Sequence, residues 1–134
     1  MNLSNEIYWL ILTCLMTGLL WIPYIINRMI EHGPWPAIWN PQPDVGAKRD
    51  WAKRMICAHG NAVENLVIFA PLAILIELLK LNSELTGIAS MVYFYSRLGH
   101  FVVFSLAIPV LRVILFFTGF VAQMILALRL LGYI

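Results

Sequence analysis

Polar side chains interrupt an apolar stretch in the first half of the chain, and their spacing suits ligand binding. At about 100° per residue of an α-helix, Arg54, Asn61 and Asn65 fall within one narrow stripe. Glu64 lies on the flank of that stripe. His59 points roughly 140° away from Arg54, so we do not expect the two to share a site within one helix. His59 could face a neighbouring subunit or the expected helix at 85–107, either as a packing residue or as a functional one.

A second stripe follows further along the chain, where Tyr93, Arg97, His100 and Phe104 share one helical face. Arg97 lies about ten residues from the inner end of its expected helix, or roughly 15 Å at 1.5 Å per residue. An arginine at that depth in a membrane costs about 2.5 to 3.5 kcal/mol, so we expect it to be paired or to lie in a polar cavity. Glu64, at about the same level, is the expected counter-ion, and the same pair could instead be a purely structural lock between two helices.

Arginines on three expected helices could converge on one half of a bundle. Arg54 and Arg112 lie nearer the membrane edge than Arg97, where reaching toward lipid headgroups is the ordinary alternative. Together they favour an anionic ligand, because guanidinium groups bind carboxylates through two parallel hydrogen bonds. Asn61 and Glu64 could hold an amine or amide, so the set fits a small zwitterionic, peptide-like molecule, while the apolar surroundings suit a second, lipophilic substrate.

The composition indicates that the helices carrying these polar residues lie in a membrane. The chain has 134 residues, of which 61% are hydrophobic and 12% charged, and its mean hydropathy is +0.81. Soluble proteins have about a quarter charged residues, and a transmembrane helix needs roughly 20 apolar residues. We therefore predict an all-α membrane protein, a four-transmembrane-helix bundle forming a single domain over residues 1–134, with helices at about 5–28, 50–79, 85–107 and 109–131.

The connections and the charge distribution complete this outline. Between Glu31 and Gly46, four prolines and two tryptophans predict one long irregular loop at the level of the lipid headgroups. Basic side chains gather at the connections on that side: Arg28, Lys48, Arg49, Lys53, Arg54 and Arg112. That side is predicted to be cytoplasmic, so both termini should lie on the non-cytoplasmic side.

Two other kinds of function find no support in the sequence. The net charge is only +2 and the basic residues are spread along the chain, so nucleic acid is not an expected partner. Cys14 and Cys57 form neither a disulfide framework nor a metal-ligand spacing, so we expect free thiols and no metal site.

At these residues the chain resembles the MAPEG family, the membrane-associated proteins of eicosanoid and glutathione metabolism. The resemblance is carried by Arg54-x-x-x-Ala58-His59-x-Asn61-x-x-Glu64-Asn65, followed by Phe69-x-Pro71-Leu72. It covers essentially the whole chain, whose length and helix layout also match. The chain looks most like a bacterial-type member, similar to the microsomal glutathione transferases.

The resemblance implies a homotrimer of four-helix subunits, in the inner membrane if the source is bacterial, that binds glutathione between adjacent subunits near the cytoplasmic side. Arg112 would be the catalytic residue, stabilising the glutathione thiolate. The glutathione-binding residues would be Arg28, Arg54, Asn61, Glu64, Tyr93, Arg97 and His100. Phe104 and Phe116 depart from the pattern, since the family's eicosanoid enzymes have tyrosines at the corresponding positions.

Three functional hypotheses follow. The leading one is a glutathione-dependent membrane transferase or peroxidase acting on lipophilic electrophiles, in general detoxification rather than a specialised eicosanoid step. The alternative, favoured by the missing tyrosines, is a non-catalytic or glutathione-independent lipid-binding protein on the same fold. A third, a proton-coupled exporter, requires a membrane-embedded carboxylate; the first helix has none between Glu6 and Arg28, although Glu64 keeps this hypothesis open.

Overall fold

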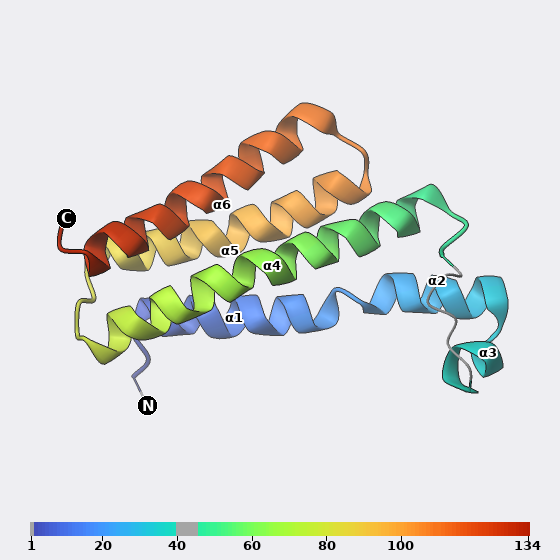
Figure 1. The fold of residues 1–134 in the computed structure, drawn as a ribbon, viewed down its shortest axis with the longest axis horizontal. Helices are drawn as coiled ribbons and strands as arrows, with labels where there is room; N and C mark the ends of the chain where they lie inside the picture. The colour runs from blue at the N-terminus through green and yellow to red at the C-terminus, as the bar shows by residue number, and fades with distance from the viewer. Residues whose placement is uncertain (1, 40–45) are drawn as a thin grey trace.

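The computed structural model describes residues 2–39 and 46–134, and every regular element in these residues is a helix (Figure 1). The six helices are α1 (Asn5–Leu19), α2 (Ile22–His32), α3 (Pro34–Trp39), α4 (Asp50–Leu78), α5 (Glu84–Ser105) and α6 (Pro109–Leu130). The last three agree with the predicted ranges to within two residues at each end.

The first predicted helix, 5–28, is interrupted in the structure. α1 ends at Leu19 and α2 begins at Ile22. The cause is Pro23, which has no N–H to donate to the carbonyl of Leu19 four residues earlier and whose ring would clash with that carbonyl. The two helices still follow one another along the bundle (Figure 1).

The prediction of one long irregular loop at Glu31–Gly46 was partly wrong. α2 continues to His32, and residues 34–39 form the short helix α3. Pro34 and Pro36 lie in the first turn of α3, where backbone N–H groups have no partner within the helix, so proline is tolerated there. Residues 40–45 of the predicted loop lie outside the described residues.

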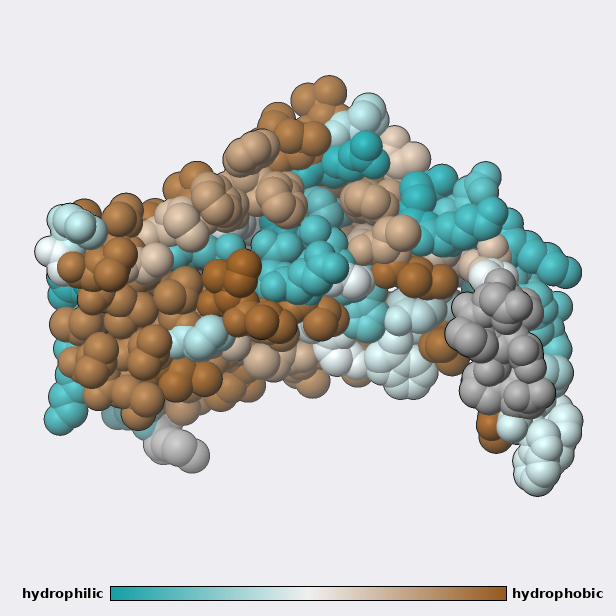
Figure 2. All heavy atoms as spheres, in the orientation of Figure 1, coloured by the Kyte–Doolittle hydropathy of each residue, from teal (hydrophilic) through white to brown (hydrophobic). Residues whose placement is uncertain are grey.

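Three segments are long and apolar enough to cross a membrane by length and composition, among the residues that the structure describes: Asn5–His32, Asp50–Leu78 and Pro109–Leu130. The chain is therefore an integral membrane protein. Figure 2 shows extensive apolar surface toward the end of the bundle where both termini lie, and hydrophilic residues in the middle and toward α2. α5 is as long as α6 but buries Ser90, Ser96, Arg97 and His100, which makes its sequence less apolar.

The packing order of the helices explains where the polar residues meet. α4 and α5 each contact α1, α6 and one another, so they form the middle of the bundle. Its core includes Phe69, Ile76, Tyr93 and Leu126, all fully buried. Polar residues that α4, α5 and α6 direct toward one another can therefore share one site.

Candidate binding pocket

A pocket of about 300 Å³ lies where α4, α5 and α6 meet. It is lined by Asn61 from α4, His100 and Phe104 from α5, and Arg112, Val113 and Phe116 from α6. The structure thus brings together three residues predicted for the site, Asn61, His100 and Arg112. Phe104 and Phe116, the two residues that depart from the pattern of the resemblance, line the same pocket.

Aromatic rings position the two basic groups of the pocket. The guanidinium carbon of Arg112 lies 5.2 Å from the centre of the Phe104 ring, a cation–π contact. The His100 ring lies 5.6 Å from Phe104 and 6.1 Å from Phe116, centre to centre. Arg112 is half-buried whereas His100 is buried, so the arginine is the more accessible of the two to a ligand.

Arg97 lies behind the wall of the pocket rather than in its lining. Only 2% of the residue is exposed. Its Nη1 donates to Asn61 Oδ1 at 3.2 Å, and its Nη2 donates to the carbonyl oxygens of Leu115 and Phe116 at 3.2 and 3.1 Å. The hydrogen-bond acceptors of this deep arginine are thus an amide oxygen and two backbone carbonyls, not the carboxylate that the sequence led us to expect.

The expected ion pair between Glu64 and Arg97 is absent within the chain. Glu64 is exposed. Among the described residues, the carboxylates that lie close to a basic side chain are Glu31, 3.7 Å from His32, and Asp50, 3.7 Å from Lys53. The reason is the direction of the side chains on α4, because Glu64 lies about 60° around the helix from Asn61. Asn61 faces α5, so Glu64 points out of the bundle.

Tyr93 also lies outside the pocket. It is fully buried and stacks on Phe69, with ring centres 3.9 Å apart and an angle of 14° between the rings. Its ring centre is 5.9 Å from the guanidinium carbon of Arg97. Within one chain, Tyr93 therefore packs in the core between α4 and α5.

The remaining predicted binding residues are distributed around the bundle. Arg54 is half-buried and its Nε donates to the carbonyl of Ser105 at 3.0 Å, which ties the start of α4 to the end of α5. Arg28 lines a separate hollow of about 180 Å³, together with Tyr24, Ile25, Ala47 and Ile56. Within one chain, neither arginine lines the pocket that contains Arg112.

His59 faces α2 rather than the pocket. Its Nδ1 lies 2.7 Å from the Tyr24 hydroxyl, and the two rings are 5.8 Å apart. The sequence suggested a neighbouring subunit or the helix at 85–107 as the contact of His59, whereas its partner within the chain is Tyr24 on α2. It links α2 to α4 on the side of the bundle where Arg28 lies.

The sequence did not single out two residues that support the pocket. Gln123 on α6 is 1% exposed and donates through Nε2 to the carbonyl of Asn65 at 2.9 Å. Gly119, one turn earlier on α6, lies against Arg97. Gln123 could have been found in the sequence as a polar residue in the most apolar of the three candidate membrane spans. Gly119 could not, because glycine has many other roles in membrane helices.

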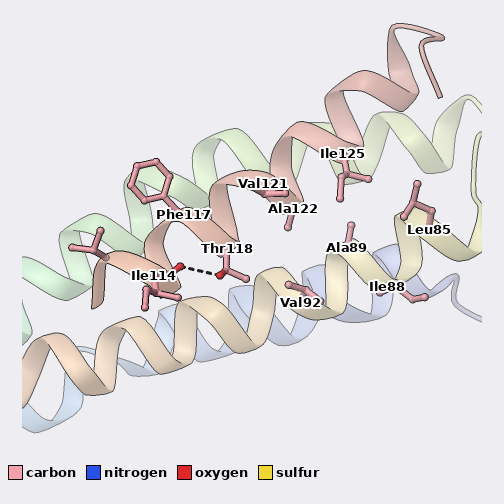
Figure 3. Close-up of a pocket in the computed structure, with 11 residues that line it drawn as sticks. Leu85, Ile88, Ala89, Val92, Ile114, Phe117, Thr118, Val121, Ala122 and Ile125 are labelled. Carbon is pink, nitrogen blue, oxygen red and sulfur yellow. Dashed lines mark hydrogen bonds between the residues drawn. The ribbon is translucent and has the colours of Figure 1, made fainter. Parts of the chain in front are cut away.

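A second, larger hollow of about 520 Å³ runs between α5 and α6. Figure 3 shows its walls, which are almost entirely apolar, with Ala89 and Ala122 as small residues between the two helices. The one hydroxyl, that of Thr118, donates to the carbonyl of Ile114 in its own helix at 2.8 Å. Val113 lines both this groove and the polar pocket.

This arrangement can bind an anion beside an apolar group. No group of three histidine, cysteine, aspartate or glutamate side chains in residues 2–39 and 46–134 could hold a metal ion. Cys14 and Cys57 are both free and exposed.

Comparison with known proteins gives one match. The sequence model of the MAPEG family matches residues 7–132, almost the whole chain. No curated protein and no solved structure matches it.

Proposed function

The chain belongs to the MAPEG family, and on that premise we propose that it is a glutathione-dependent membrane transferase or peroxidase acting on lipophilic electrophiles. Membership supports a membrane function in glutathione or eicosanoid metabolism at the level of the family. The observation that carries the more specific proposal is the pocket in which Arg112, His100 and Asn61 come together. Its cation and amide suit a small anionic peptide.

Arg112 is the residue that activates the thiol in this proposal. A free thiol has a pKa of about 8.5, and the thiolate is the nucleophile. A guanidinium beside the sulfur stabilises the thiolate, and lowering the thiol pKa by about one unit corresponds to about 1.4 kcal/mol. The aromatic rings of Phe104 and Phe116 exclude water from one side, which strengthens this attraction.

The chemical step needs only glutathione and the electrophile. In conjugation, the thiolate sulfur forms a bond to an electrophilic carbon, the leaving group departs with its electron pair, and the thiol proton goes to solvent. In the peroxidase reaction, the thiolate sulfur forms a bond to the terminal hydroperoxide oxygen and the O–O bond breaks. The alkoxide takes a proton from solvent and departs as an alcohol, which leaves the sulfenic acid of glutathione. A second glutathione then gives the disulfide and water.

We also propose that the active form is a homotrimer whose subunits meet along α4. Exposed residues follow one another on α4 at alternating spacings of three and four: Cys57, Gly60, Glu64, Val67, Pro71, Ile74 and Leu78. This spacing averages 3.5 residues, as in the contact row of packed helices. Glu64 is the only charged residue in the row, and a carboxylate facing lipid is costly.

A neighbouring subunit accounts for the predicted binding residues that lie outside the pocket. Glu64 is exposed on α4, and Arg54 on α4 and Arg28 on α2 are half-buried. In the trimer, they would reach glutathione bound at Arg112 of the adjacent subunit. The single domain would cross the membrane four times, with α5 as the fourth span and both termini on the non-cytoplasmic side.

The groove between α5 and α6 is the proposed surface for the lipophilic substrate, because its walls are apolar and Val113 connects it with the pocket. Val121→Phe should fill part of it, because Val121 lines the groove and is exposed. We expect the KM for a long-chain alkyl electrophile to rise, while the KM for a compact chlorinated dinitrobenzene stays unchanged. Equal effects on both substrates would contradict this role for the groove.

The test of the function itself is conjugation of glutathione to a chlorinated dinitrobenzene by the purified protein in lipid. Conjugation and the ultraviolet absorbance of the bound thiolate should both appear with the unaltered chain and decrease in Arg112→Ala. Native mass spectrometry should find the same assembly in both proteins, so that the loss reflects the thiolate and not unfolding.

The alternative is a glutathione-independent lipid-binding protein on the same fold. It is favoured by the lining of the pocket, since Phe104 and Phe116 supply no hydroxyl to assist catalysis. In that case, alkyl ligands would bind the protein whether or not glutathione is present, and the dinitrobenzene assay would give no product.

A further inference from the structure

The contact between α5 and α6 is built around a buried guanidinium. Arg97 on α5 donates to two consecutive carbonyl oxygens on α6, those of Leu115 and Phe116, and to the Asn61 amide oxygen on α4. Its guanidinium carbon also lies 5.3 Å from the centre of the Phe116 ring. One side chain therefore bonds to two neighbouring helices at three points.

Gly119 supplies the space that this guanidinium occupies. A Cβ at this position would lie 2.8 Å from Arg97 Nη2, 2.9 Å from Arg97 Nε and 2.8 Å from Ser96 Oγ. These distances are shorter than normal contacts between non-bonded atoms. A methyl group at this position would therefore force the side chains of Arg97 and Ser96 to move. Because Arg97 is held by three hydrogen bonds, moving it must disturb them.

The contacts of Arg97 also determine which atoms the pocket presents. A guanidinium has donors only, so the oxygen of the Asn61 amide must face it. Asn65 Nδ2 lies 3.4 Å from the same oxygen. The amide nitrogen of Asn61 is then the group left to donate to a ligand, since Asn61 lines the pocket.

The backbone that Arg97 holds carries the rest of the pocket. Leu115 and Phe116 lie within the turn of α6 that follows Arg112. Phe116 lines the pocket with Arg112 and Val113. Fixing the two carbonyls therefore fixes where this turn of α6 lies relative to His100 on α5.

We propose that Arg97 is a positioning residue and not a glutathione contact: with Gly119 providing the space, it holds the start of α6 and the Asn61 amide so that Arg112, His100 and Asn61 face one pocket. This inference rests on the proposed function for its catalytic consequence. It differs from the role that the family resemblance implies for Arg97.

The first test is Gly119→Ala, with Gly18→Ala in α1 as the matched control because nothing lies within 4 Å of a Cβ added there. We expect conjugation to fall by up to about 100-fold in Gly119→Ala, as for a displacement of about 1 Å, and to stay unchanged in Gly18→Ala. In an Arg97→Met background, the added methyl should have little further effect, since the two changes act on one contact. Additive losses would overturn the proposal.

A second test separates positioning from direct contact. Binding of glutathione and of γ-glutamylcysteine, which lacks the glycine carboxylate, is measured for the unaltered chain and for Arg97→Met. Glutathione esterified at the glutamate carboxylate is the third ligand. A positioning residue weakens all three by the same factor. If the loss disappears for one ligand, Arg97 pairs with the missing or blocked group and the proposal is wrong.

A third measurement needs no glutathione. Hydrogen–deuterium exchange should increase in residues 109–118 of Gly119→Ala and Arg97→Met, and remain unchanged in α1. Arg97→Lys, which keeps the charge but not the planar group with its three contacts, replaces Arg97→Met if that variant does not fold. Unchanged exchange would overturn the proposal, whereas a lack of glutathione binding by the unaltered chain would overturn the proposed function alone.

Discussion

The proposed chemistry depends on one residue, Arg112, through its guanidinium group. It lies against the Phe104 ring and at the edge of the pocket. Asn61, His100 and Arg112 could all be selected from the sequence, because polar residues in membrane helices are costly and therefore informative. That the three side chains face the same pocket could be predicted only approximately.

Arg112→Lys tests whether the shape of the cation matters in addition to its charge. Lysine keeps the charge but loses the planar group that stacks on Phe104 and forms paired hydrogen bonds. We expect the conjugation rate at neutral pH to fall about tenfold, equivalent to about 1.4 kcal/mol in the barrier. A rate equal to that of the unaltered chain would show that charge alone suffices.

Asn61→Leu tests the pairing of the buried arginine. The substitution leaves Arg97 Nη1 without its acceptor, and an unsatisfied buried donor costs about 1 to 3 kcal/mol. We expect a lower thermal unfolding temperature in detergent. The control is Asn65→Leu, which removes hydrogen bonds to Asn61 and leaves Arg97 paired; an equal decrease in both variants contradicts the pairing argument.

The error about Glu64 shows what a single helix sequence omits. Helical phase gives the angle between side chains on one helix, here about 60° between Asn61 and Glu64. Which of the two meets Arg97 depends on the rotation and height of α4 relative to α5. This rotation and height depend on the packing of Phe69 against Tyr93 at the interface between α4 and α5. The positions of side chains around α4 alone give no information about that packing.

At the scale of helices, the boundaries of α4, α5 and α6 were predictable because their end signals agree with the hydrophobic pattern. α5 begins with a capping box in which Ser83 and Thr86 exchange hydrogen bonds between side chain and backbone. α6 begins at Pro109, a favoured first position. The break between α1 and α2 was missed because Pro23 lies in a continuous apolar run, which composition alone favours as one span.

Ser83→Ala tests the capping of α5. We expect a loss of about 0.5 to 2 kcal/mol of unfolding free energy, the usual contribution of such a cap. Ser4→Ala at the start of α1 is the comparison, since its single bond to the Ile7 N–H is longer, at 3.4 Å, and its loss should be smaller. A larger loss in Ser4→Ala would contradict this account of the α5 terminus.

At the scale of the whole molecule, composition was sufficient to predict a helical membrane protein, because apolar length is required to cross a bilayer. The row of exposed residues on α4 was not recognised from the sequence. Every membrane helix has many apolar positions, and only burial separates those that face the bundle from those that face outward.

Val67→Trp tests assembly through that row. Val67 is 69% exposed on α4, so a tryptophan is tolerated by one subunit but collides with a second copy packed there. We expect native mass spectrometry to find the trimer in the unaltered chain and mainly smaller species in the variant. The matched control is Val102→Trp on α5, which is 46% exposed and should leave the trimer intact; loss of assembly in both variants would contradict an α4 interface.

Glutathione binding to the purified protein in lipid nanodiscs, measured by isothermal titration calorimetry, tests the central claim most directly. The pocket of Asn61, His100 and Arg112 predicts saturable binding that weakens in Arg112→Ala and for S-methylglutathione, which cannot form a thiolate. No heat of binding to a correctly assembled protein would contradict the proposed function.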